Sequence, residues 1–137
     1  MEQAKTLLEQ EGYTCVLRAG ETLHTSRLRG VAPLLGWLEE GAVAPGFVAA
    51  DKVVGRATAF LYCLLGAKAV YAGVISQGAL EVLQRYSIEA SYGQLVPYIH
   101  NRTGDGMCPM EAATADSHTP QEALTAIRQK LQQLRGN

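Results

Sequence analysis

Apolar residues recur at helical spacing near both ends of the chain. A first helix is predicted over residues 2–10, with an apolar face made by Ala4, Leu7 and Leu8. A last helix is predicted to begin at Thr119 and Pro120, which suit the N-cap and first-turn positions, and Glu122 completes a capping box. Its buried stripe consists of Leu124, Ile127, Leu131 and Leu134.

Alternating apolar and polar residues predict an antiparallel hairpin after the first helix. One strand covers residues 13–17 and a second covers residues 22–25, and the tight turn 19–21 joins them. A further helix is predicted to begin near Ala32, because Pro33 is tolerated in a first turn but breaks a helix interior.

The segment 51–65 is apolar on nearly every face, which is typical of a helix buried against a sheet. Asp51 would cap this helix, and the apolar run 69–75 would follow it as a buried strand. Ser76 suits the N-cap of the next helix. Residues 88–99 resemble a strand that is interrupted by a glycine and a proline.

Helices that alternate with strands predict βαβ units and a largely parallel sheet, to which the opening hairpin adds an antiparallel edge. The fold class is therefore α/β, with a mixed sheet covered by helices. No linker, repeat or charge block divides the chain, so residues 1–137 are expected to form a single domain. Ligands of such sheets usually bind beyond the carboxyl ends of the strands.

Charge and cysteine usage argue against several classes of partner. Twelve basic and thirteen acidic residues give a net charge of -1, which offers no excess positive field to nucleic acid or to an anionic membrane. The apolar stretch 57–75 contains Lys68, so a buried helix and strand explain it better than a membrane span. The three cysteines lack metal-finger spacing and no signal peptide opens the chain, so a cytoplasmic protein with reduced thiols is expected.

The first candidate site is the glycine-rich segment 97–111. Cys108 would be the N-cap of a helix and Pro109 its first residue, and backbone N–H groups at such a terminus stabilise an anionic ligand or a thiolate. In the alternative interpretation the segment is a structural turn, and Glu111 folds back to cap the helix. In the functional interpretation the ligand would contact Asn101, Arg102, Thr103, Gly104 and Gly106.

The second candidate site is the predicted start of the buried helix, at Asp51. Lys52 and Arg56 would lie at the positive end of the helix dipole, where an anionic ligand would offset their charge. Gly55 would share a face with Asp51, and its cost in a helix suggests that a ligand or another backbone approaches closely there. The alternative is a cap with a tight helix–sheet contact and solvated basic side chains.

The remaining polar residues do not add a metal or cofactor site. His24, His100 and His118 lack the mutual spacing of metal ligands, so no metal and no cofactor are expected. Cys15 and Cys63 lie in apolar segments and are expected to be core residues.

The segments 51–57 and 101–111 resemble those of a bacterial family of unknown function that is placed in the cytidine-deaminase-like superfamily. The resemblance covers nearly the whole chain. It implies a three-layer α/β/α sandwich in which the Asp51 helix lies where zinc deaminases carry their first metal-binding motif. The H-x-E and P-C-x-x-C motifs of those enzymes are absent, since Asp51 and Lys52 stand where His and Glu would be expected. Deaminase activity is therefore not carried over from the fold.

Three functions are consistent with these features. The first is an enzyme that acts on a small nucleotide-like or anionic metabolite, with Cys108, Asp51 and Glu111 as candidate catalytic residues. The second is a non-catalytic module that binds a nucleobase or nucleotide, with Arg102 and Lys52 against the charged part of the ligand. The third is a homo-oligomeric interaction protein, since an apolar content of 47% allows a buried interface.

Overall fold

The computed structural model describes residues 1–101 and 103–135, which form six helices and five strands. The helices are α1 (Glu2–Gln10), α2 (Ala32–Glu40), α3 (Arg56–Leu65), α4 (Gln77–Arg85), α5 (Pro109–Ala113) and α6 (Pro120–Arg135). The strands are β1 (Cys15–Ala19), β2 (Thr22–Ser26), β3 (Val48–Val54), β4 (Ala69–Ser76) and β5 (Glu89–Val96). The predicted helices at both ends, the opening hairpin and the helix start at Ala32 are confirmed. Leu134, which was predicted to belong to the buried stripe of the last helix, is 58% exposed, because it lies in the final turn of α6, beyond the buried residues of that helix.

The five strands form one open sheet in the order β2-β1-β3-β4-β5. β1 runs antiparallel to β2 and β3, whereas β3, β4 and β5 are parallel to one another. In the turn between β1 and β2, Gly20 has a φ of 63°, a conformation that glycine adopts without strain. The predicted mixed sheet with a hairpin at its N-terminal edge is therefore confirmed.

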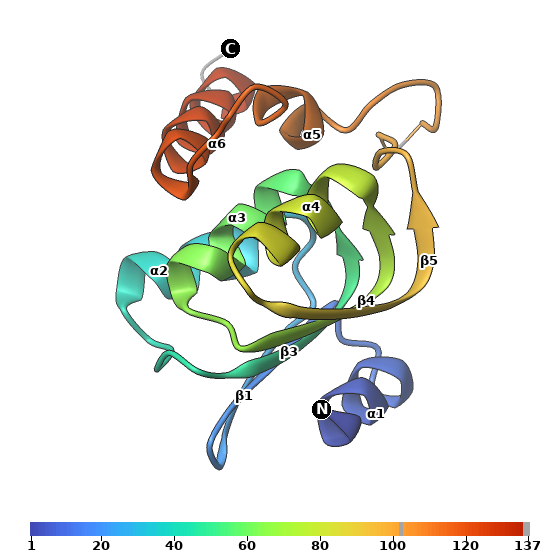
Figure 1. Ribbon diagram of the computed structural model, residues 1–137, viewed down its shortest axis with the longest axis vertical. Coiled ribbons are helices and arrows are strands. Elements are labelled where there is room, and N and C mark those ends of the chain that lie inside the picture. The colour runs from blue at the N-terminus through green and yellow to red at the C-terminus, as the bar shows by residue number, and fades with distance from the viewer. Residues whose placement is uncertain (102, 136–137) are drawn as a thin grey trace.

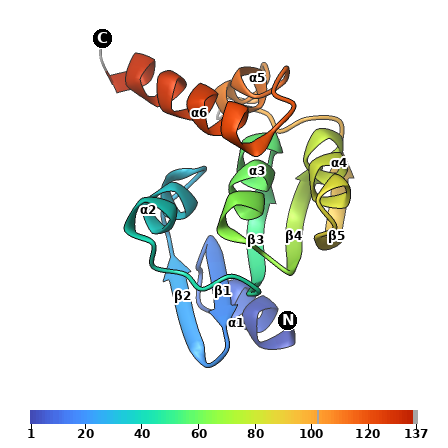
Figure 2. The ribbon, with the colours of Figure 1, turned by 60° about the vertical axis from the view of Figure 1, so that its left-hand side comes forward.

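Helices lie on both faces of the sheet (Figure 1). α1 packs over β1 and β3 on one face, where the small buried cluster comprises Ala4, Leu8, Val16 and Ala50. α2, α3 and α4 lie on the other face, and α5 and α6 pack against α3 farther from the sheet (Figure 2). The main core fills this second side, and its largest buried side chains include Phe47, Phe60, Leu61 and Tyr62. Among the described residues, no helix is both long and apolar enough to cross a membrane.

The prediction that Asp51 opens the buried helix is wrong. Residues 48–54 form β3, which pairs with β1 on one side and with β4 on the other, and α3 begins only at Arg56. Asp51 is therefore a strand residue, and Gly55 occupies the N-cap position of α3. The error has a physical reason, because the last apolar residues of β3, Val53 and Val54, lead directly into the largely buried α3. Periodicity alone does not separate a short apolar strand end from the start of a buried helix.

Two glycines lie side by side in the parallel part of the sheet. The register places Gly73 of β4 between Lys52 of β3 and Gly93 of β5. A Cβ atom on Gly73 would lie 2.8 Å from the Lys52 carbonyl oxygen, and one on Gly93 would lie 2.9 Å from the Gly73 carbonyl oxygen. Both positions therefore require glycine, because a backbone carbonyl of the neighbouring strand fills the space that a side chain would need.

Two predicted helix starts are confirmed by their hydrogen bonds. The Ser76 hydroxyl accepts a hydrogen bond from the Ala79 N–H at 3.2 Å and caps α4. At α6, the Thr119 hydroxyl accepts one from the Glu122 N–H at 3.1 Å, and the Glu122 carboxylate accepts one from the His118 N–H at 2.9 Å. Glu122 thus reaches one residue farther back than in a capping box.

Candidate functional site

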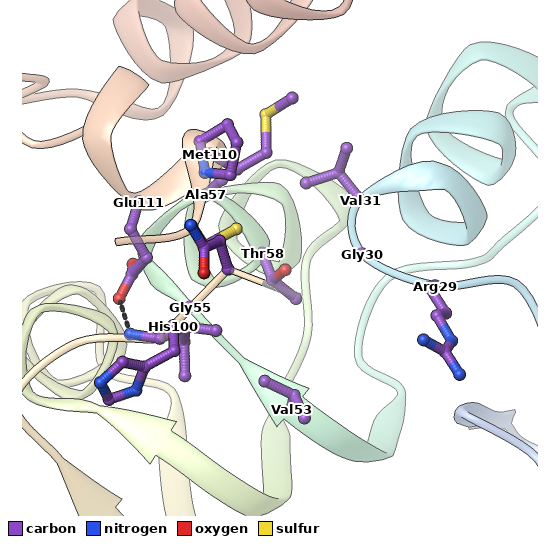
Figure 3. Close-up of a pocket in the computed structure, with 14 residues that line it drawn as sticks. Arg29, Gly30, Val31, Val53, Gly55, Ala57, Thr58, His100, Met110 and Glu111 are labelled. Atoms are coloured by element: carbon purple, nitrogen blue, oxygen red, sulfur yellow. Dashed lines mark hydrogen bonds between the residues drawn. The ribbon is translucent and has the colours of Figure 1, made fainter. Parts of the chain in front are cut away.

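A pocket of about 400 Å³ opens at the carboxyl end of β3 (Figure 3), and we call it the β3 pocket. The loop before α2, the end of β3, the start of α3, the segment after β5 and the start of α5 all contribute to it. Its walls are mainly apolar, with a few polar groups among them, as is typical of small-molecule sites. The lining residues are Arg29, Gly30, Val31, Val53, Gly55, Ala57, Thr58, Ile99, His100, Asn101, Cys108, Pro109, Met110 and Glu111.

Glu111 on α5 holds three of these segments together. Its buried carboxylate accepts hydrogen bonds from the Arg56 N–H at 2.5 Å and from the Ile99 N–H at 2.8 Å, the latter drawn dashed in Figure 3. Because Arg56 is the first residue of α3, Glu111 caps α3 and not its own helix. Gly55 permits this contact, since a Cβ atom there would lie 3.0 Å from the Glu111 carboxylate. The close approach predicted at Gly55 is thus made by a side chain of the protein itself.

Arg56 is directed away from the β3 pocket, and its side chain links α3 to a distant segment of the chain. Its Nε donates to the Thr114 carbonyl at 2.8 Å and its Nη2 donates to the Ser117 carbonyl at 2.7 Å. Its guanidinium also lies 5.1 Å from the centre of the Phe60 ring. Arg56 therefore ties the start of α3 to the segment between α5 and α6, and it is not among the described residues that line the pocket.

The glycine-rich loop satisfies much of its own hydrogen-bonding capacity. The Asn101 side-chain oxygen accepts hydrogen bonds from the Thr103 hydroxyl at 3.1 Å and from the Gly104 N–H at 2.9 Å. Asp105 accepts hydrogen bonds from the Thr103 hydroxyl and the Asn101 amide, which lower the pKa of the Asp105 carboxyl below its usual value. Among the described residues of the loop, the side chains of Asn101, Thr103 and Asp105 therefore bond to one another.

Only part of the loop reaches the β3 pocket. Asn101 lines it, whereas Thr103, Gly104 and Gly106 are not among its described lining residues. Arg102, which was also predicted to contact a ligand, lies outside the described residues.

Cys108 is the N-cap residue of α5, as predicted, and its side chain makes no capping hydrogen bond. It is half-buried and lines the β3 pocket together with His100 and Glu111. α5 has only five residues, so the helix-dipole effect expected at its first turn is weaker than that of a full-length helix.

Asp51 belongs to a buried hydrogen-bonded cluster with Cys15 and Tyr62. Asp51 and Cys15 are cross-strand neighbours on β3 and β1. The Tyr62 hydroxyl donates to Asp51 Oδ2 at 2.7 Å and lies 3.3 Å from Cys15 Sγ, and the Val53 N–H donates to Asp51 Oδ1 at 3.3 Å. Burial raises the pKa of Asp51 to about 7, although the hydrogen bonds from Tyr62 and Val53 act in the opposite direction. This carboxyl therefore changes its protonation state near neutral pH.

A second hollow, of about 320 Å³, lies over this cluster, and we call it the Asp51 hollow. It shares Arg29, Gly30 and Val53 with the β3 pocket, so the two adjoin. Cys108 lines the first and Asp51 the second, which means that the predicted catalytic pair does not meet in one pocket. The residues that line the Asp51 hollow are Thr14, Cys15, Leu28, Arg29, Gly30, Pro33, Asp51, Lys52 and Val53.

Arg29, Thr58 and Tyr62 are among the residues of the site that had not been predicted from the sequence. Arg29 lines both hollows, Thr58 lines the β3 pocket and Tyr62 contacts Asp51. Arg29 precedes Gly30, whose φ of 67° marks a turn just before α2, and an Arg-Gly pair at a helix entry was the only signal available. Thr58 and Tyr62 lie within an apolar run that was interpreted as core.

The potential metal ligands do not converge. Within residues 1–101 and 103–135, no three His, Cys, Asp or Glu side chains lie close enough together to hold a metal ion. Asp51 and Cys108 in particular line different hollows.

Comparisons with known proteins identify the family. The chain is similar in fold to the crystal structure of a DUF1893 family protein (TM1506) from Thermotoga maritima, with a TM-score of 0.86 and 24% sequence identity over 94% of this chain and 88% of that chain. No curated protein matches this sequence. The model of the family described as TM1506, domain of unknown function (DUF1893), matches residues 3–131. Because that match spans nearly the whole chain, this protein belongs to the DUF1893 family.

Proposed function

We propose that this protein binds a small organic anion in the β3 pocket, with the apolar body of the ligand against the walls and its anionic group toward Arg29. The pocket itself carries the proposal, because it combines a volume of about 400 Å³ with mainly apolar walls and a cationic side chain at its rim. Small-molecule sites typically have volumes of roughly 300–1,000 Å³. Arg29 and His100 lie on opposite sides of the pocket in Figure 3, which leaves the space between them to the ligand.

The chemistry of the walls supports a flat or mostly apolar ligand body, such as an aromatic ring or a nucleobase. Val31, Val53 and Met110 offer apolar contact, and Thr58, His100 and Asn101 add polar groups. The carboxylate of Glu111 is already hydrogen-bonded to two backbone N–H groups, which offsets part of its repulsion of an anion. Arg29 then supplies the charge that favours an anionic ligand.

A thermal-shift panel of aromatic carboxylates, nucleosides and nucleotides tests this proposal. A ligand at a hundred times its dissociation constant stabilises the folded protein by about 2.7 kcal/mol. Arg29→Gln is expected to weaken binding of an anionic ligand roughly tenfold or more, since hydrogen bonds to charged groups contribute about 1.5–3 kcal/mol. Arg18→Gln, on β1 and away from the pocket, serves as the matched control. A panel in which no compound shifts the unfolding transition would contradict the proposal.

Catalysis through Cys108 and Asp51 is the second candidate function. It is favoured by the position of Cys108 in the β3 pocket and by the buried Asp51 cluster beneath the adjoining hollow. The test measures turnover of any ligand that the panel identifies, in Cys108→Ser and Asp51→Asn, with Cys63→Ser as the control. Turnover that equals wild type in both site variants would exclude this role for them.

We also infer a three-layer α/β/α sandwich of the cytidine-deaminase-like superfamily. The resemblance of segments 51–57 and 101–111 supports this inference, and a mixed sheet with helices on both faces is compatible with it. Zinc-dependent deamination is not part of the inference, because the H-x-E and P-C-x-x-C motifs are absent from the sequence. Superposition of an experimental structure on a zinc deaminase tests the assignment, and a different strand order in the two proteins would refute it.

A further inference from the structure

The β3 pocket continues into a groove between α2 and α6. A hollow of about 300 Å³ shares Arg29, Gly30, Val31 and Met110 with the β3 pocket. A further hollow of about 410 Å³ shares Leu35, Glu39, Leu131 and Arg135 with the first. We call these two hollows together the α2–α6 groove. Figure 2 shows α6 lying across from α2, and both helices pack against α3.

The groove has an apolar floor and a net positive charge. Val31, Leu35 and Leu131 supply apolar surface along its length. Of the described side chains that line it, the charged ones are Arg29, Arg128, Arg135 and Glu39. The hollow next to the β3 pocket is lined by Arg29, Glu39 and Arg135, and the farther one by Glu39, Arg128 and Arg135, so each has one more cation than carboxylates, which favours an anion along the whole groove.

Gly36 on α2 keeps the groove open. It lines the groove, and a Cβ atom at this position would have no other heavy atom within 4 Å. Glycine in a helix interior costs about 1 kcal/mol relative to alanine, so the missing side chain is a disadvantage for α2 itself. The absence of a side chain at Gly36 does, however, leave free space on the side of α2 that lines the groove.

We propose that the α2–α6 groove binds the chain of an elongated amphiphilic anion, whose apolar head occupies the β3 pocket and whose anionic end lies at Arg128 and Arg135. This inference rests on the function proposed for the β3 pocket and extends it, because it sets the length of the ligand and the position of its charge. A short ligand of the same class ends at Arg29, whereas a longer one runs over Val31 and Leu35 toward Arg135.

Two probes of one chemical series separate the groove from the pocket. Phenylacetate is short enough for the β3 pocket alone, and ω-phenyloctanoate adds a chain long enough to enter the groove. Their dissociation constants are measured by isothermal titration calorimetry on the full chain. The longer probe is expected to bind more tightly, by about three- to fourfold for each additional methylene that becomes buried.

Gly36→Phe is the decisive variant, because its ring fills the groove from an unstrained helical position. It is expected to lower the affinity for ω-phenyloctanoate to about that for phenylacetate. Gln129→Phe adds the same ring on the exposed side of α6 and serves as the control. Arg135→Gln is a second, less intrusive variant, and it is expected to weaken the longer probe more than the shorter one.

The outcomes distinguish the two proposals. If phenylacetate binds and the longer probe binds no more tightly, the groove proposal is overturned and the pocket proposal stands. The same holds if Gly36→Phe and Arg135→Gln both leave the ratio of the two affinities unchanged. If neither probe binds while a more compact anion of the thermal-shift panel does, the ligand ends within the β3 pocket and the groove proposal is again overturned. If no compound binds at all, the function proposed for the β3 pocket fails first.

Discussion

Asp51 is a buried carboxyl, and no basic side chain of the described residues is among the groups that shift its pKa. Its partners are a phenol, a thiol and a backbone N–H, and burial outweighs them, so its pKa rises to about 7. Such a group opposes folding whenever it is ionised in the unfolded chain but must be neutral in the folded one. Asp51 also lines a hollow that adjoins the β3 pocket. Residues with strongly shifted pKa values that lower stability are expected at functional sites.

The stability of the wild-type protein relative to Asp51→Asn is expected to fall as pH rises. In the unfolded chain Asp51 ionises near its usual pKa of 3.8, whereas in the folded chain it keeps its proton until about pH 7. Between these values the unfolded state binds fewer protons, so the free energy of unfolding decreases by about 1.4 kcal/mol per pH unit, and the decrease ends above the folded-state pKa. Urea denaturation over this pH range measures the difference. Parallel curves for wild type and Asp51→Asn would disprove it, and the exposed Asp116→Asn is the control.

At the scale of the element, the three parallel strands are shaped by two glycines. Side chains at Gly73 and Gly93 would meet the carbonyl oxygens of the preceding strand in the sheet. Gly73 lies between the partners of Asp51 and Val53, the β3 residues that line the hollows. The close backbone contact at Gly73 thus lies next to the part of β3 that lines the two hollows.

Gly73→Ala is expected to destabilise the protein by about 1–3 kcal/mol, because its Cβ atom would meet a backbone carbonyl that cannot rotate away. Gly36→Ala is the matched comparison, since its Cβ atom would meet no other atom and a helix favours alanine by up to about 1 kcal/mol. Urea denaturation of the two variants should therefore give changes of opposite sign. A Gly73→Ala variant as stable as wild type would show that the strands can move apart there.

At the scale of the whole molecule, β5 leaves one edge of the sheet open (Figure 1). Tyr92 and Leu95 on this strand are 41% and 39% exposed, and Glu89 is its only charged residue. An edge strand with unpaired backbone groups and little charge favours pairing with another strand. The homo-oligomer predicted from the composition would be formed most simply by two β5 strands related by a twofold axis.

Leu95→Lys is therefore expected to reduce self-association, because a lysine on an edge strand opposes strand pairing. Sedimentation velocity over a range of protein concentrations measures the association of wild type and variant. Leu134→Lys, on an exposed apolar residue of α6, controls for the added charge. A wild-type protein that stays monomeric at high micromolar concentration would refute the predicted oligomer.

The sequence by itself determined the features that depend on neighbours in the chain. The amphipathic helices α1 and α6, the hairpin of β1 and β2, and the cap at Ser76 follow from spacing and turn chemistry within a few residues, and all were predicted. The position of Cys108 at a helix start was predicted for the same reason. Lys68 within the apolar stretch 57–75 likewise argued against a membrane span at that position.

Tertiary structure alone decided how the candidate site is assembled. Glu111 caps α3 from 55 residues away, and Tyr62 reaches Asp51 only because α3 folds back over β3. Whether Asp51 belonged to a helix or a strand also depended on its pairing with β1 and β4, since the short apolar end of β3 runs into the buried α3 without a change of pattern. Contacts between distant segments leave no periodic signal in a sequence. The β3 pocket and the separate Asp51 hollow could therefore be located only in the folded chain.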